Sequence, residues 1–253
     1  MEHWHRSGQA LLNEISSTRL HASQLAVWSI GQCGFIFKYE DTVVCIDPVL
    51  SDLTGPSGSR RCYPAPFAPE ALRADLVLCT HGHADHMAKD PLRGLARHPA
   101  ARFVLPAGCS ALAAEYGIPA DRITTVQEGS ILPLGGVTVR AFSAAHPEHI
   151  LDAGDPGMAL GYQLTFGGFT VVHLGDTYLT PHLYETPAPT CCWPPSTGRT
   201  SSAPSATASA IWKPRRPLSW PSGWARPAPS PPITTWCRAT PWTRCDLLRP
   251  CVS

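Results

Sequence analysis

The sequence predicts a mixed fold of the α/β or α+β class, on three observations. Its first part carries short runs of β-branched and aromatic residues separated by brief turns. Farther along, strand-like and helix-like segments alternate. Two later strand-like runs are joined by Gly167-Gly168, which is typical of a hairpin. Because hairpins and helical crossovers occur together, we expect sheets with helices packed on them.

The first predicted elements form a meander of strands. Residues 25–30, 35–39 and 42–46 are apolar, β-branched or aromatic, and polar or Gly-containing turns separate them. A polar, Pro- and Gly-rich loop follows at residues 47–69, and then a short helix-like piece leads into the apolar run 76–79. A loop of that length suggests a substrate-binding role.

Strand-like and helix-like segments then alternate. We predict a helix at residues 91–97 with Asp90 as its cap, a strand at 102–105 and a second helix at 108–116. Further strands are expected at residues 123–126, 137–142, 158–166 and 169–174. No internal repeat is visible.

The composition changes after Thr186. Residues 1–186 contain 12 Lys and Arg against 18 Asp and Glu, whereas residues 187–253 contain eight against one, together with 14 of the 27 prolines. Leu, Ile and Val number only six in those last 67 residues, too few to bury an apolar core. We therefore expect an N-terminal extension at 1–24, a folded domain at 25–186 and a disordered Pro-, Trp- and Arg-rich tail at 187–253.

The cysteines and the N-terminal segment favour a soluble cytoplasmic protein. Cys33, Cys45 and Cys79 lie in or beside apolar strand-like runs rather than in a paired framework, so we interpret them as small buried side chains. Residues 1–20 lack the apolar segment of a signal peptide. No run approaches the roughly 18 apolar residues of a membrane span, so no membrane association is expected.

The segment with the most specific chemistry directly follows the apolar run 76–79. His81, His83, Asp85 and His86 form an H-x-H-x-D-H pattern there. Imidazoles and a carboxylate at this spacing, in a tight loop at a strand end, can converge on two metal ions about 3.5–4 Å apart. Solvated loop histidines are the alternative, which the fixed spacing disfavours. The pattern therefore predicts a binuclear metal site.

Two further candidate ligands follow strand ends. They are His146 and Asp176, and functional sites commonly assemble where strands end. His149 is an alternative to His146, and a turn or helix-cap role is the alternative for Asp176. His173 is a candidate to support Asp176 without binding metal itself.

These motifs resemble those of the metallo-β-lactamase superfamily. The histidine-rich cluster, His146 and the turn Leu174-Gly175-Asp176-Thr177 carry the resemblance, which covers residues 25–185. Within the superfamily, the segments Trp28-Ser29-Ile30-Gly31-Gln32-Cys33-Gly34-Phe35 and Cys45-Ile46-Asp47-Pro48 are similar to the branch that contains L-ascorbate-6-phosphate lactonase and related metal-dependent hydrolases.

The resemblance implies a four-layer αββα sandwich with two metal ions at one edge. The implied ligands are His81, His83 and His146 for one ion, Asp85 and His86 for the other, and Asp176 bridging them. Water shared by two cations loses its proton at about pH 7 and becomes the nucleophile, and Asp85 could also shuttle a proton. Zinc is the expected metal, with manganese and iron as alternatives, because His and carboxylate ligands suit all three.

The last ligand of the family is missing. The family closes its second metal site with a His near the C-terminus, and no His follows His182. A reading-frame shift near Thr186 would explain this. When the third base of each codon is joined to the next two bases, residues 190–198 can be re-read as DVLLAPING, 206–214 as RNCIGNMEA and 231–245 as PTHHYMVPGNTVDPL, which resembles the missing motif.

A natural proline-rich extension is the alternative to a frame shift. If the printed chain is the frameshifted product, we expect an incomplete second metal site, uncovered apolar faces, poor stability and little activity.

The expected function is metal-dependent hydrolysis of a lactone or related small-molecule ester. A phosphodiesterase or nuclease of the same superfamily is the second candidate, but the net charge of −6 over residues 1–186 disfavours nucleic acid. The third is a non-catalytic metal-binding protein whose tail recruits a protein partner. The sequence leaves the oligomeric state open.

Overall fold

The computed structural model describes residues 6–52, 63–146, 159–177, 191–193 and 210–212. Its helices are α1 (Gly8–Ser17), α2 (Lys89–Leu95), α3 (Ser110–Glu115) and the short 3-10 turns η1 (Pro69–Ala71), η2 (Ala107–Cys109) and η3 (Ala120–Arg122). Its strands are β1 (Leu25–Gly31), β2 (Gly34–Tyr39), β3 (Thr42–Ile46), β4 (Leu76–Leu78), β5 (Arg102–Pro106), β6 (Ile123–Val126), β7 (Ile131–Leu134), β8 (Val137–Ser143), β9 (Leu160–Phe166), β10 (Phe169–His173), β11 (Cys191–Trp193) and β12 (Ala210–Trp212).

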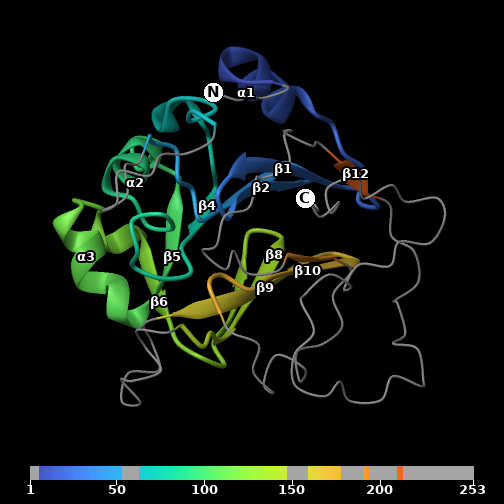
Figure 1. Ribbon diagram of the computed structural model, residues 1–253. Coiled ribbons are helices and arrows are strands. Elements are labelled where there is room, and N and C mark those ends of the chain that lie inside the picture. The colour runs from blue at the N-terminus through green and yellow to red at the C-terminus, as the bar shows by residue number, and fades with distance from the viewer. Residues whose placement is uncertain (1–5, 53–62, 147–158, 178–190, 194–209, 213–253) are drawn as a thin grey trace, which may run out of the picture.

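Two sheets pack together, and helices cover the outer face of the larger one (Figure 1). The larger sheet has the order β12-β1-β2-β3-β4-β5-β6, and the smaller has β11-β10-β9-β8-β7. This arrangement confirms the mixed α and β class that the sequence predicts. The described residues supply three layers of the expected sandwich, namely helices, larger sheet and smaller sheet.

Two apolar clusters form the core. The first lies between the larger sheet and the helices, and it includes Leu11 of α1, Trp28 of β1 and Leu92 of α2. The second lies between the two sheets, where Phe37 and Phe166 have ring centroids 5.9 Å apart. The larger sheet is thus apolar on both faces, which explains the almost continuous apolar runs in its strands.

Helix α1 lies in the segment that we separated as an N-terminal extension. Leu11 and Ile15, four residues apart, are both buried in the first cluster, as the helical period requires. The Lys38 ammonium of β2 donates to the backbone oxygens of Ile15 and Ser16 at 2.8 and 3.1 Å, which satisfies carbonyls at the end of the helix. Residues 8–17 therefore belong to the same packed body as the strands.

The structure corrects two local predictions. Helix α2 begins at Lys89 with Ala88 in the cap position, so Asp90 lies in the first turn and is not the cap. Strand β7 was missed because it contains Pro133, and β7 is an edge strand, where proline is tolerated. Strands β11 and β12 are two three-residue segments within the tail of unusual composition.

Both tail strands add to strands that would otherwise be edges. Strand β11 runs parallel to β10, and β12 runs antiparallel to β1. An edge strand presents unpaired backbone groups, so it can order a short segment of unfavourable composition. The rest of the tail lies outside the described residues.

The uncovered apolar faces that we expected are not found in the described part of the chain. The single large apolar side chain that is exposed there is Ile131, at 60%. In β9, buried Tyr162, Leu164 and Phe166 alternate with partly exposed Gln163 and Thr165. The outer face of this strand is therefore polar and needs no apolar cover. Among the described residues, no helix is long and apolar enough to span a membrane.

Candidate metal centre

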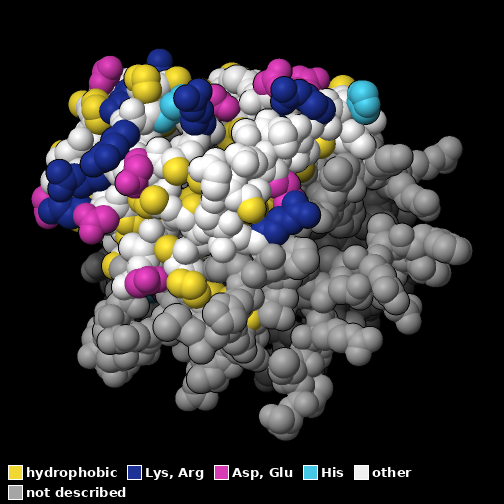
Figure 2. Space-filling model, turned by 90° about the horizontal axis from the view of Figure 1, so that it is seen from above, with side chains coloured by type: hydrophobic (Ala, Val, Ile, Leu, Met, Phe, Trp, Pro, Cys, Tyr) yellow, Lys and Arg dark blue, Asp and Glu magenta, His cyan; other side chains and the backbone are white. Residues whose placement is uncertain are grey.

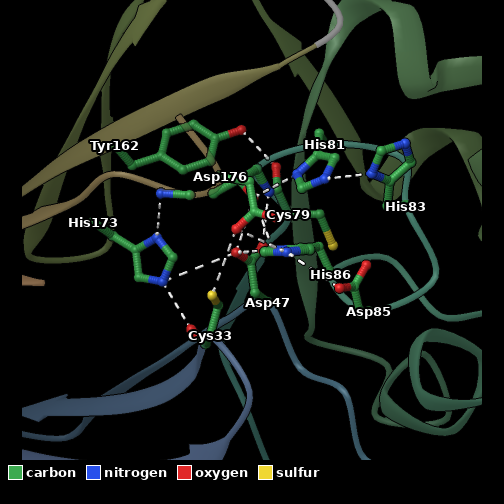
Figure 3. Close-up of polar contacts among 12 residues, drawn as sticks. Cys33, Asp47, Cys79, His81, His83, Asp85, His86, Tyr162, His173 and Asp176 are labelled. Atoms are coloured by element: carbon green, nitrogen blue, oxygen red, sulfur yellow. Dashed lines mark hydrogen bonds and ion pairs between the residues drawn. The ribbon is translucent and has the colours of Figure 1, made fainter. Parts of the chain in front are cut away.

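The ends of several strands bring polar side chains together in one cluster (Figure 3). Strands β3 and β4 are parallel, so Asp47 and the loop that starts at Cys79 leave the larger sheet side by side. Strands β8 and β10 are both antiparallel to β9, so His146 and Asp176 leave the smaller sheet in a common direction. The turn between β1 and β2 lies beside them, because Phe35 pairs with Ile46.

Backbone contacts tie the histidine-rich loop to the smaller sheet. His81 forms an isolated bridge with Ala159, and the Leu160 amide donates to the Thr80 carbonyl at 2.9 Å. The buried Tyr162 hydroxyl donates to the Cys79 carbonyl at 2.8 Å. The loop is therefore held between the two sheets, where side chains from both can meet.

His81, His83 and His146 form the first group of candidate ligands. One ring nitrogen from each lies within 4.8 Å of the others, and His81 Nε2 is 3.0 Å from His83 Nδ1. Burial, and next the charge of His86, lower the pKa of His81 to about 3. The His81 ring is therefore neutral at neutral pH, and it offers a lone pair to a cation.

Cys33, His86 and Asp176 form the second group. One donor atom from each lies within 4.8 Å of the others. His86 Nε2 is 3.4 Å from Asp176 Oδ1, and the Cys33 thiol is 3.9 Å from the same oxygen. His86 is buried and Asp176 is about one-fifth exposed, with a relative exposure of 22%.

The buried carboxylate of Asp47 orients the histidines of both groups. It accepts from the Thr80 amide at 2.8 Å, from the Thr80 hydroxyl at 2.9 Å and from His86 Nδ1 at 2.8 Å. Burial alone would raise the pKa of Asp47, but the charge of His86 and its hydrogen bond lower it. Asp47 is therefore ionised and can only accept hydrogen bonds.

These bonds fix the ring nitrogens that face the site. Because the Thr80 hydroxyl donates to Asp47, it accepts from His81 Nδ1 at 3.1 Å, which leaves His81 Nε2 as the acceptor nitrogen. His86 donates Nδ1–H to Asp47, so its Nε2 faces Asp176. Histidines that bind metal through one ring nitrogen commonly donate the N–H of the other to a carboxylate, as His86 does here.

The neighbouring carboxylates favour the charged form of His86. Burial alone would lower its pKa, but the charge of Asp47 and the hydrogen bonds with Asp176 and Asp47 raise the pKa of His86 well above its ordinary value. A cation bound by His86 Nε2 and Asp176 would compete with a proton on that nitrogen.

His173 contacts the backbone of the two turns that carry Asp176 and Cys33, in keeping with the supporting role that the sequence suggested. Its Nδ1 accepts from the Gly175 amide at 3.1 Å, so its Nε2 carries the proton and donates to the Cys33 carbonyl at 2.8 Å. Burial lowers the pKa of His173, in keeping with a neutral ring. This one ring therefore anchors both the turn before Asp176 and the turn that carries Cys33.

The structure gathers five of the six predicted ligands into the two groups. They are His81, His83, His86, His146 and Asp176. Asp85 lies at the rim instead, with half of its side chain exposed and its Oδ2 3.9 Å from His86 Nε2. The alternative ligand His149 lies outside the described residues.

Sequence reasoning missed three residues of this centre, namely Cys33, Asp47 and Thr80. Cys33 is buried, as the apolar context predicts, but its thiol faces Asp176 rather than core side chains alone. Asp47 could have been found, because it directly follows an apolar strand. A carboxylate that is buried at such a place needs a charged or hydrogen-bonding partner, which points to a polar site. Thr80 carried no local signal.

The two groups fit divalent cations. Zinc binds imidazole nitrogen at about 2.0–2.1 Å, so two tetrahedral nitrogen or oxygen ligands lie about 3.3 Å apart. The 3.0 and 3.4 Å separations within the groups match this spacing. The donors also suit a cation chemically, since neutral imidazole, thiol sulfur and carboxylate oxygen are its usual protein ligands.

The chain is similar in sequence to known proteins. An uncharacterized protein of Mycobacterium tuberculosis is 33% identical over 129 residues, which cover 49% of this chain and 35% of that protein. A UPF0173 metal-dependent hydrolase of Chloroflexus aurantiacus is 32% identical over 154 residues, which cover 55% of this chain and 63% of the relative. The chain thus spans about a third of the first relative and under two thirds of the second.

A structural comparison and a family comparison complete the picture. A Veillonella parvula protein described as a possible metal-dependent hydrolase superposes with a TM-score of 0.52 at 18% identity, over 64% of this chain and 66% of that one. That likeness shows the fold alone. The family model of the beta-lactamase superfamily domain matches residues 42–196, more than half of the chain and all five gathered ligands. The chain therefore belongs to the beta-lactamase superfamily.

Proposed function

We propose that the protein is a hydrolase that opens a lactone or a related small-molecule ester with the help of two divalent cations. The observation that carries the proposal is the meeting of two three-donor groups at one edge of the sheets. Zinc is the first candidate metal, and manganese and iron(II) suit the same donors.

When bound, the cations would polarise the attacked carbonyl and lower the pKa of water. The protein's own residues supply orientation and proton transfer. Asp47 and Thr80 orient His81 and His86 so that the Nε2 atom of each ring could bind a cation. Asp85 stands at the rim with a half-exposed carboxylate, so it can pass a proton between the site and solvent.

The lactone class is supported by two segments that shape this centre. They are the turn with Cys33 and the segment with Asp47, which resemble the lactonase branch in sequence. The Chloroflexus relative carries the description of a metal-dependent hydrolase, which agrees with the reaction type.

Charge favours a small substrate over nucleic acid. Residues 1–186 have a net charge of −6, and nucleic-acid binding normally needs a basic patch. Figure 2 shows Lys and Arg side chains lying beside acidic ones over the described part of one face.

The test compares His81→Ala with His21→Ala, a histidine that is exposed and remote from the groups. We expect the parent protein to bind zinc and to hydrolyse members of a sugar-lactone panel, at a low rate if its tail is frameshifted, measured by proton release. His81→Ala should lose one bound ion and at least about 100-fold in rate, whereas His21→Ala should lose neither. Turnover that persists in His81→Ala, or a metal-free parent after zinc loading, would contradict the proposal.

A further inference from the structure

The backbone around Cys33, a member of the second group, is held in place by specific contacts. Its carbonyl accepts from His173 Nε2 at 2.8 Å, which fixes the backbone of the turn between β1 and β2. The next residue, Gly34, packs so closely that an added Cβ would lie 2.7 Å from Ile30 Cγ1 and 2.8 Å from the Asp47 carbonyl. The turn is therefore locked against the segment that carries Asp47.

The locked turn directs the thiol toward the donors of His86 and Asp176 (Figure 3). The side chain is nearly buried, with 7% exposure. The groups that face it are Asp176 from the turn after β10 and His86 from the loop after β4. The thiol thus lies beside polar donors from two other segments of the chain, which is an unusual environment for a cysteine that only fills space.

The distances suit a shared cation. With a zinc–sulfur bond of about 2.3 Å and a zinc–oxygen bond of about 2.0 Å, tetrahedral sulfur and oxygen ligands lie about 3.5 Å apart. The Cys33 thiol is 3.9 Å from Asp176 Oδ1, and His86 Nε2 is 3.4 Å from that oxygen. All three donor atoms lie within 4.8 Å of one another, so modest side-chain adjustments would place them around one ion.

We infer that Cys33 is a thiolate ligand of the cation held by His86 and Asp176. On binding, the thiol proton leaves to solvent, and a sulfur–metal bond forms. Cys33 then supplies the third protein donor of a site for which the printed chain has no C-terminal His. The inference rests on the proposed binding of a cation to the second group, and it adds the identity of a donor that motif spacing did not suggest.

The test adds Co²⁺ to the metal-free full chain and records the absorption spectrum of the complex. A thiolate on Co²⁺ gives a sulfur-to-metal charge-transfer band in the near ultraviolet, whereas nitrogen and oxygen ligands give only the visible d–d bands. We expect the parent protein to show the charge-transfer band as the second equivalent of Co²⁺ binds. Cys33→Ser keeps the side-chain size. It should lose that band and lower the affinity for the second equivalent of Co²⁺ by about tenfold or more.

Cys45→Ala is the matched control, because Cys45 is a buried thiol of β3 in the first core cluster. It should keep the band. Cys33→Ala serves as a second variant if the serine disturbs folding, which near-ultraviolet circular dichroism of the metal-free proteins would reveal.

The outcomes separate this inference from the proposed function. Co²⁺ that binds with visible bands alone, or a charge-transfer band that survives in both Cys33 variants, overturns the role of Cys33 and leaves the hydrolase proposal standing. A parent protein that binds no Co²⁺ overturns both.

Discussion

At the scale of single residues, the candidate centre depends on one buried charge. Asp47 is 0% exposed and accepts three hydrogen bonds, from the amide and hydroxyl of Thr80 and from His86. A buried carboxylate is tolerated only when it is paired and hydrogen-bonded. Asp47 binds no cation in this arrangement, yet it decides which nitrogens of His81 and His86 face one.

Asp47→Asn should weaken both the fold and metal binding. The amide keeps the shape of the carboxylate, but its NH₂ group would face either the Thr80 amide N–H, or both the Nδ1–H of His86 and the Thr80 hydroxyl. We expect a loss of about 2–4 kcal/mol in the free energy of unfolding of the metal-free protein, measured in urea, and a fall of about 10- to 100-fold in zinc affinity.

Asp75→Asn provides the comparison, because Asp75 accepts from the Val43 amide at 2.8 Å through Oδ2, away from both groups. It should lower stability and leave zinc affinity unchanged. Equal zinc affinities in the Asp47 and Asp75 variants would refute the orienting role of Asp47.

At the scale of elements, the centre depends on how the turn after β10 packs against the loop after β4. Gly175 has φ +61°, and an added Cβ would lie 2.9 Å from Thr80 Cβ. Glycine is required there for two separate reasons, the left-handed backbone and the close approach to Thr80. The turn thereby brings Asp176 beside His86.

Gly175→Ala should cost roughly 2–4 kcal/mol in unfolding free energy, since backbone strain and overpacking both contribute. Gly117→Ala isolates the strain, because Gly117 has φ +76° and nothing within 4 Å of its added Cβ, and it should cost only about 1–2 kcal/mol. Urea unfolding of the two variants measures the difference. If the two costs are equal, the contact with Thr80 does not constrain the turn.

At the scale of the whole molecule, the described residues form helices on one sheet and that sheet on another. Helices cover the outer face of the larger sheet, and the second apolar cluster closes the space between the sheets. The family match runs from residue 42 to residue 196, so it extends ten residues past the change in composition at Thr186.

The nucleotide sequence across residues 184–253 should show a second open frame that encodes a His-containing motif. The shifted frame gives plausible residues both where the codons leave a choice and where they allow a single amino acid. Tryptophan has a single codon, so Trp212, Trp236 and Trp242 dictate Glu, Val and Asp in the shifted frame, and each suits its segment. Sequencing the gene measures this directly, and stop codons in that frame would show that the printed tail is genuine.

The local part of the structure followed from the sequence. The strands of the larger sheet and the alternation with helices were predictable, because side-chain periodicity and turn residues act over a few positions. The same holds for His81, His83 and His86, whose spacing within one loop is itself the signal. Strand β7 and the paired tail segments were missed, because edge pairing depends on partners distant in the chain.

Only the tertiary structure decided which residues complete the centre. Cys33 and Asp176 are 143 positions apart, and Asp47 and His86 are 39 apart, so no local pattern links them. They meet because parallel β3 and β4 end together and the β1–β2 turn lies beside β3. The sequence by itself determined the fold class and the histidine cluster, since both are written in short-range spacing. The burial of Asp47 and the direction of the Cys33 thiol were decided by packing between segments that are far apart in the chain.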